Sequence, residues 1–271
     1  MTDLRGMQQL VQACWRRSKP LAAPHVGDLA WWSRNGTDGV RIWRDAQEIV
    51  AWGWPDADDG SLEFLVDPDR PDLAREVLAA YPDVEATWAL DSDAGKRLAV
   101  LEAGFRRNDG AWFELLGRGL DDLPEPAVPG GFELRSSRGF AELGARVEVH
   151  RAAFHPSRLT RPKYARVTAT WPYREELDLV IEAPSGRLAA FCLAWLDEEN
   201  AVGELEPVGT HPDFRRRGLA RAVCLGALRA LRERGAATAV VYAAGGDRGA
   251  SPLYLALGFE RLGRIERFQR G

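Results

Sequence analysis

The spacing of apolar positions divides the second half of the chain into strands that alternate with helices. Short apolar runs bounded by turn residues predict strands at 132–136, 177–182, 188–196, 202–210, 237–243 and 261–269. Apolar residues at helical spacing predict helices at 139–153, 216–234 and 250–257, and a proline-interrupted, helical segment up to 170. This order predicts the α/β class, with a mixed sheet covered by helices on both faces.

A proline-rich segment separates this half from the first. Between Gly119 and Gly131 the chain carries three prolines, at positions 124, 126 and 129, which disfavour both helix and sheet. Residues 121–130 are therefore predicted to link a first domain, at 1–120, to a second domain, at 131–271. The length of 271 residues suits two ordinary domains.

Composition and charge restrict the classes of function. The chain is 45% hydrophobic and 28% charged, as is normal for a soluble protein, and its net charge of -4 argues against a general nucleic-acid binder. Cys14, Cys192 and Cys224 are widely spaced in apolar surroundings, which predicts buried thiols in a reducing compartment. Because the sequence shows no signal peptide or membrane span, we expect a cytoplasmic protein without a membrane partner. The oligomeric state stays open.

The most informative stretch is the turn between the strand at 202–210 and the helix that follows it. The turn contains two patterns, Thr210-x-Pro212 and Arg215-Arg216-Arg217-Gly218-Leu219-Ala220. The first backbone N–H groups of a helix have no partner within the helix and lie at its positive end. Three arginines add charge, and a glycine lets a ligand approach the backbone closely. Together they predict a site for a phosphorylated ligand, with an ordinary basic helix start as the alternative.

Two neighbouring segments add to this pattern. The chain runs from Asp247 to Phe259 as Asp-x-x-Ala-x-x-Leu-Tyr-x-x-Leu-Gly-Phe, in which Gly258 suits the end of a helix. The strand before the turn carries Glu204, Glu206 and Pro207. Since proline cannot donate a hydrogen bond to a neighbouring strand, we expect a bulge or a local break in pairing at this point.

These segments together resemble the GNAT (N-acetyltransferase) superfamily. The turn is similar to the family's acyl-CoA pyrophosphate loop, usually Gln/Arg-x-x-Gly-x-Gly/Ala, and the later segment to its closing helix, where Asp247 replaces the usual asparagine. The strand at 203–210 is similar to the family's fourth strand, which separates from its neighbour to admit the pantetheine arm. The resemblance covers most of residues 131–271 and implies acetyl-CoA as co-substrate and no metal. The residues that it implies for cofactor binding are Val208, Gly209, Thr210, Arg215, Arg216, Arg217, Gly218, Leu219, Ala220 and Asp247.

The first half reads as a degenerate copy of the second. The run at 62–68 parallels the strand that ends at Pro212, and 101–106 parallels 255–260. The copied turn, Asp69 to Asp72, has no glycine; its Pro71 lacks an N–H donor, and its two aspartates would repel a phosphate. We therefore expect two tandem GNAT-like domains, similar in arrangement to the mycothiol synthases, with binding and catalysis in the second.

Candidate catalytic residues follow from what transfer to an amine requires. Free amines are mostly protonated at neutral pH, and a carboxylate can take that proton directly or through water. Glu204 and Glu206 are two apart in a predicted strand and so share a face, together with Val208 and Thr210. Glu204 is the slightly preferred base and Glu206 the residue that positions water or substrate, with solvated carboxylates as the alternative. Tyr254, at the position of the family's tyrosine acid, is the candidate proton donor to the CoA thiolate, with a core tyrosine as the alternative.

The resulting prediction is an acetyl-CoA-dependent N-acetyltransferase that acetylates a primary amine by direct attack in a ternary complex. No cysteine lies near the proposed site in sequence to argue for an acyl-enzyme. The acceptor stays open between a small-molecule amine, such as an amino sugar, and a peptide amine. The alternative from another class is a non-catalytic acyl-CoA-binding sensor, which would need the arginine–glycine turn but neither a glutamate base nor Tyr254.

Overall fold

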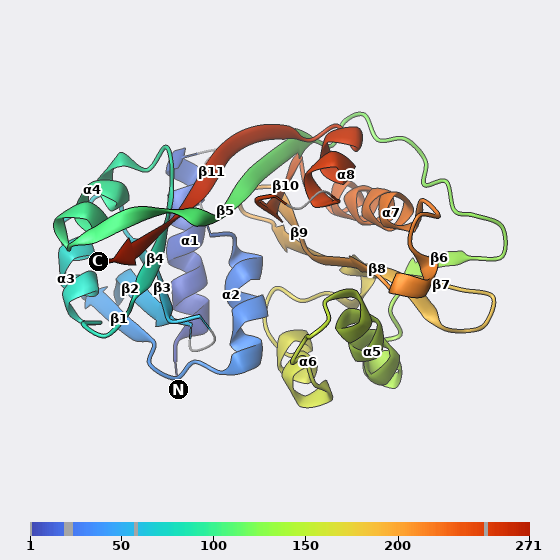
Figure 1. The fold of residues 1–271 in the computed structure, drawn as a ribbon, viewed down its shortest axis with the longest axis horizontal. Helices are drawn as coiled ribbons and strands as arrows, with labels where there is room; N and C mark the ends of the chain where they lie inside the picture. The colour runs from blue at the N-terminus through green and yellow to red at the C-terminus, as the bar shows by residue number, and fades with distance from the viewer. Residues whose placement is uncertain (1, 19–23, 57–58, 247–248) are drawn as a thin grey trace.

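In a computed structural model of the chain, the strands form one mixed sheet of eleven members (Figure 1). The structure describes residues 2–18, 24–56, 59–246 and 249–271. From one edge of the sheet to the other, the strand order is β1-β2-β3-β4-β11-β5-β10-β9-β8-β7-β6. This arrangement agrees with the predicted mixed α/β class.

The first half supplies one edge of the sheet. Its strands are β1 (Arg41–Asp45), β2 (Glu48–Pro55), β3 (Ser61–Val66), β4 (Ala86–Leu90) and β5 (Phe105–Gly119). Its helices are α1 (Leu4–Ser18), α2 (Val26–Trp32), α3 (Leu73–Ala79) and α4 (Ala94–Glu102), and a short 3-10 turn, η1 (Ser33–Asn35), follows α2.

The second half supplies the other edge and follows the predicted order of elements. Its strands are β6 (Glu133–Ser136), β7 (Asp178–Glu182), β8 (Leu188–Asp197), β9 (Val202–Thr210), β10 (Thr238–Ala244) and β11 (Glu260–Arg270). Its helices are α5 (Leu143–Ala153), α6 (Arg161–Thr168), α7 (Leu219–Glu233) and α8 (Ala250–Ala256), with 3-10 turns η2 (Gly139–Glu142), η3 (Glu175–Leu177) and η4 (Pro212–Phe214). The helix predicted at 139–153 therefore opens with a 3-10 turn.

Helices cover both faces of the sheet, as predicted. Strand β8 shows the alternation: Cys192 and Ala194 pack in the core beneath α7, whereas Leu193 and Trp195 pack against α2, α5 and α6. Helix α1 lies on the same face as α2, because both contribute to a core that includes Val240 of β10. Helices α3 and α4 cover the first half on the α7 face.

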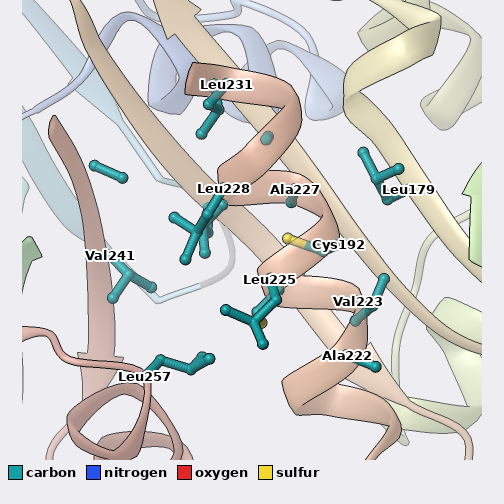
Figure 2. Close-up of a cluster of buried hydrophobic side chains, with 14 of the residues drawn as sticks. Leu179, Cys192, Ala222, Val223, Leu225, Ala227, Leu228, Leu231, Val241 and Leu257 are labelled. Carbon is teal, nitrogen blue, oxygen red and sulfur yellow. The ribbon is translucent and has the colours of Figure 1, made fainter. Parts of the chain in front are cut away.

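The core of the second half forms around α7. Val223, Leu228 and Leu231 lie on the broad buried side of this helix, which packs over β7, β8 and β9 (Figure 2). Burial of each such side chain contributes about 1.5–3 kcal/mol, so this side fixes α7 against the strands. The turn that precedes α7 is thereby held at the ends of β9 and β10.

The two halves interleave at the centre of the sheet. Strand β5 pairs antiparallel with β10 on one side and with β11 on the other. Strand β11, the last of the chain, also pairs antiparallel with β4. Each half therefore inserts a strand between strands of the other. As a result, one sheet contains strands from both sides of the linker at 121–130.

Cys14, Cys192 and Cys224 are buried and unpaired, as predicted. Within the described ranges, no helix combines the length and the apolar character needed to cross a bilayer.

Candidate active site

A groove opens where β9 and β10 separate. The two strands pair in parallel over three residues only, from Val202 opposite Thr238 to Glu204 opposite Val240. Beyond Glu204, β9 continues for six residues to Thr210 without a β10 partner in the register. On that side the β9 backbone beyond Glu204 has no strand partner, because β8 pairs with the other side of β9. The Thr210 carbonyl accepts from Arg215 Nε at 3.4 Å.

A bulge interrupts the regular pairing of β9 with β8 beside this groove. Cys192 lies opposite Val208 and Ala194 opposite Leu205, so β9 contains one residue more than β8 between these pairs. The extra residue falls at Glu206-Pro207, where the indole N–H of Trp195 donates to the Glu206 carbonyl at 2.7 Å. The expected interruption at Pro207 is therefore present.

The bulge also corrects one prediction. Glu204 and Glu206 were expected to share their face with Val208 and Thr210. Instead Leu205 and Val208, three apart, both pack in the core beneath α7. Thr210 pairs with Ala190 of the same core, whereas Glu204 pairs with Trp195 on the opposite face. An extra residue reverses the alternation of a strand, so the glutamates lie on the α2 face and Val208 and Thr210 on the α7 face.

The turn after β9 is shaped for close approach to its backbone. Arg216 and Gly218 have φ angles of 65° and 78°, in the left-handed region, so α7 begins at Leu219 and not at 216 as predicted. Gly218 offers no side-chain cap to the first helical N–H groups, and a Cβ added there would meet open space. Arg215, Arg216 and Arg217 are all exposed around these groups. The turn therefore combines open amides, a helix N-terminus and three cations.

Three carboxyl groups meet on the α2 face of the groove. Asp28 of α2, Glu204 and Glu206 bring carboxylate oxygens within 4.8 Å of one another, a spacing at which a cation could be held. Glu204 is completely buried, Asp28 nearly so, and Glu206 is partly exposed. Burial raises the pKa of all three groups, well above the usual range for Asp28 and Glu204, and the charge of Glu206 raises the pKa of Glu204 further.

A histidine from the first half holds Glu204. His25 is fully buried at the start of α2, and its Nδ1 lies 3.0 Å from Glu204 Oε2. Its Nε2 lies 3.3 Å from the Val202 carbonyl, and its backbone N–H donates to Asp28 Oδ2 at 2.7 Å. Burial lowers the pKa of His25 below its usual value. The first half therefore contributes two titratable side chains to the carboxyl cluster.

One cavity of about 1110 Å³ connects the groove with the first half. Ala243 and Tyr254 line it from the α7 face, whereas Glu206, Tyr242 and Asp28 line it from the α2 face. The cavity thus passes between β9 and β10 and reaches the carboxyl cluster. Glu204 and His25 are absent from its described lining. Tyr254 lies in α8, 6% exposed, while Asp247 lies outside the described residues.

The comparisons with known proteins agree with this geometry. Residues 146–259 match the family model described as "Acetyltransferase (GNAT) family". A mycothiol acetyltransferase of Rhodococcus jostii is 31% identical over 262 residues, covering 84% of this chain and 82% of the relative. Another, from Nocardia farcinica, is 31% identical over 195 residues, covering 69% of this chain and 64% of the relative.

The chain belongs to the GNAT family of acetyltransferases. Its fold is also similar to a solved "Tandem GNAT protein from the clavulanic acid biosynthesis pathway", with a TM-score of 0.65 and 17% identity, covering 99% of this chain and 95% of that chain. The predicted class is confirmed: the protein is an acetyl-CoA-dependent N-acetyltransferase. No finding favours the non-catalytic sensor.

The first GNAT-like half has a second groove with different contents. Strands β3 and β4 pair in parallel only at Ser61 and Leu62 before they separate. The Lys96 ammonium enters this groove and donates to the Phe64 carbonyl at 2.8 Å, 4.3 Å from the centre of the Phe64 ring. In the turn that follows, Arg70 is bound by both oxygens of Asp72. The Phe64 carbonyl in this groove and the Arg70 guanidinium in the turn therefore already have partners within the protein.

No sequence motif pointed to His25 and Asp28, which lie far from the glutamates along the chain. The one local signal is their spacing, because His25-x-x-Asp28 forms a capping box at the start of α2. That pattern indicates a helix start. Its contact with β9, across 179 residues, depends on the tertiary fold.

Proposed function

We propose that this GNAT enzyme acetylates a cationic small-molecule amine held in the cavity between its two halves. The described lining contains more acidic than basic side chains: the acids are Asp28, Asp38, Asp56, Asp59, Glu63, Asp67, Asp93 and Glu206, and the bases are Arg34, Lys96 and Lys163. Such a wall attracts an ammonium group and disfavours an anionic acceptor. The names of the relatives point to the unacetylated amine form of mycothiol as the first acceptor to test.

Glu206 is our candidate for the base. Its carboxyl group lines the cavity, whereas Glu204 is completely buried behind it and bound to His25. The Asp28 carboxyl group acts on both glutamates: hydrogen bonding with Asp28 lowers the pKa of Glu206 and of Glu204, while its bond with Glu206 raises the pKa of Asp28. The pair is thus arranged with the proton on Asp28 and the charge on Glu206, which is the form that accepts a proton from an ammonium.

The cofactor is assigned to the groove between β9 and β10. The open amides of the turn at 215–220 would bind the pyrophosphate, and the edge of β9 at Val208, Gly209 and Thr210, which has no β10 partner, would bind the pantetheine amides. In this assignment the thioester would lie where the groove meets the carboxyl cluster. Asp247 stays a predicted contact.

The proposed reaction is a direct transfer in a ternary complex. Glu206 takes a proton from the bound ammonium, the neutral nitrogen attacks the thioester carbonyl, and the C–S bond breaks as the tetrahedral intermediate collapses. Tyr254, on the cavity wall, gives a proton to the departing thiolate and regains the second proton that the nitrogen loses as the amide forms, and the proton on Glu206 leaves to solvent through the cavity. The scheme uses no metal ion.

We assign a single cofactor site to the protein, in the second half. In the groove between β3 and β4, Lys96 donates a hydrogen bond to the Phe64 carbonyl, and in the turn after β3 Arg70 is bound by Asp72. Calorimetric titration with CoA should therefore give one site per chain. Two sites of similar affinity would contradict this assignment.

The test of the function is release of CoA on incubation with acetyl-CoA and a panel of amines. The panel contains the amine form of mycothiol, glucosamine, a diamine and a peptide with a free N-terminus. The proposal expects the small cationic amines to turn over and Glu206→Gln to lower kcat by about 10²–10⁴-fold, the range for general base catalysis. As a control, Glu125→Gln changes an exposed linker carboxyl group. Preferred turnover of the peptide would contradict the acceptor class.

A further inference from the structure

His25 has both ring nitrogens engaged, which restricts where its proton can be. The Val202 carbonyl accepts only, so Nε2, 3.3 Å away, must carry the hydrogen. The Gly27 N–H, 3.1 Å from Nδ1, points at that nitrogen as a donor. A hydrogen on Nδ1 would point at the hydrogen of this N–H, and the two donors would repel each other. The contacts therefore favour a neutral ring with a bare Nδ1.

This ring state determines the state of Glu204. Its Oε2 lies 3.0 Å from Nδ1, a hydrogen-bond distance, and a bare nitrogen can be bonded only by a donor. Oε2 must then carry the proton, and Nδ1 shares its one lone pair between this O–H and the Gly27 N–H in a three-centre hydrogen bond. Oε1 has no N–H donor among the described residues, and although a hydrogen bond from Asp28 lowers the pKa of Glu204, burial at zero exposure raises that pKa more.

We propose that His25 is a positioning residue: it accepts the Glu204 O–H at Nδ1, keeps Glu204 neutral, and so leaves one negative charge on the Glu206–Asp28 pair. Three ionised carboxylates could not remain within 4.8 Å of one another in a buried site. The first half thus determines which glutamate acts as the base. The proton location itself does not depend on the proposed function; the kinetic consequence does.

Other charged groups face this cluster and belong to its titration. Those on neighbouring elements that act on His25, Glu206 or the nearby Tyr242 are Asp197 at the end of β8, Arg34 of η1 and Glu63 of β3. Asp197 is bound by Gln12 and Asn200, and Glu63 faces Lys96 at 4.0 Å. Asp28 acts on both glutamates, because hydrogen bonding with it lowers the pKa of Glu204 and of Glu206.

The direct test is spectroscopic and uses the full-length protein. In infrared difference spectra at neutral pH, Glu204→Gln should remove a carboxylic-acid C=O band that the wild type shows. In ¹⁵N NMR, the signals lost in His25→Asn should be those of a neutral ring with hydrogen on Nε2. An imidazolium spectrum at neutral pH, or no acid band lost in Glu204→Gln, would overturn the proposal.

Kinetics provide the second test. His25→Phe removes the acceptor, so the proton of Glu204 can redistribute to Glu206; the acid limb of kcat/KM should move up by about one pH unit, with the KM for acetyl-CoA unchanged. His25→Asn keeps an acceptor oxygen and should restore much of the wild-type profile. His155→Asn, at an exposed histidine, is the control. Identical profiles for the two His25 variants would refute a positioning role, whereas absence of turnover in the wild type would refute the proposed function and leave the spectroscopic result standing.

Discussion

Gly27 lies where α2 of the first half touches the carboxyl cluster, and Gly27→Ala tests that contact. A Cβ at this position would lie 2.5 Å from Trp195 Cδ1 and 2.6 Å from Glu204 Oε2. Ordinary contacts are about 1 Å longer. Trp195 is completely buried and its N–H is bonded to the Glu206 carbonyl, so α2 or Glu204 has to move.

The expected magnitude follows from this overlap. Overpacking of this kind costs about 1–3 kcal/mol, and each kcal/mol lowers the Tm of a chain of this size by about 2–4 °C, so we expect a fall of roughly 2–12 °C. A displacement of about 1 Å at the catalytic groups lowers kcat by about 100-fold. The loss of turnover should therefore persist well below the Tm of the variant.

The matched control is Gly95→Ala. Gly95 is likewise the second residue of its helix, α4, and the nearest atom to an added Cβ is Asp93 Oδ1 at 3.7 Å. Gly95 lines the cavity beside Lys96, but its added methyl group touches neither the carboxyl cluster nor the cofactor turn, so this variant should keep the wild-type kcat and melt at or slightly above the wild-type Tm. Calorimetry and a CoA-release assay measure both quantities. If Gly27→Ala melts lower but turns over normally, the first half does not position the catalytic groups.

Three further predictions concern the tyrosine, the cofactor turn and a second buried histidine. Tyr254→Phe should lower kcat by about 10²–10⁴-fold with little change in the Kd of acetyl-CoA; an unchanged kcat contradicts the acid role. Gly218→Ala and Gly235→Ala both place a Cβ at positive φ and should each cost about 1–2 kcal/mol of stability, but only Gly218→Ala should weaken CoA binding in calorimetry. Burial and the nearby Arg146 lower the pKa of His150 to about 3, so the unfolded chain binds this proton first as the pH falls below 6.5. The free energy of unfolding should decrease between pH 6.5 and 3 by up to about 1.4 kcal/mol per pH unit. When it is measured by urea titration at several pH values, His150→Gln should show a smaller decrease per pH unit than the wild type.

Local patterns predicted most of the second half correctly. The apolar runs located β7 to β11, and Pro207 marked the bulge in β9, because these features depend on neighbouring residues. The start of α7 was placed three residues early. Arginines favour a helix, but Arg216 and Gly218 adopt positive φ angles that only the tertiary position of the turn explains.

The composition of the site was harder to predict because it depends on distant contacts. The pattern Glu-x-Glu identified both carboxylates, yet the bulge determined their faces and the fold determined their exposure. Glu204 lies behind Glu206 because α2 covers it, and α2 belongs to the half whose own cofactor turn is degenerate. The degenerate turn argued against cofactor binding in the first half, but it gave no information on side chains supplied to the other site. The cytoplasmic location stays a prediction.

The interleaving of β5 and β11 has a consequence for how this protein can be divided. A fragment that starts after the linker would lack β5, the strand that joins β10 to β11, while a fragment that ends before the linker would lack β11, the strand that joins β4 to β5. Neither fragment can complete its own hydrogen-bonding ladder, so the two should melt as one cooperative unit and regain activity only when mixed. A half that has lost its cofactor turn thus remains indispensable, because the working half is built around one of its strands.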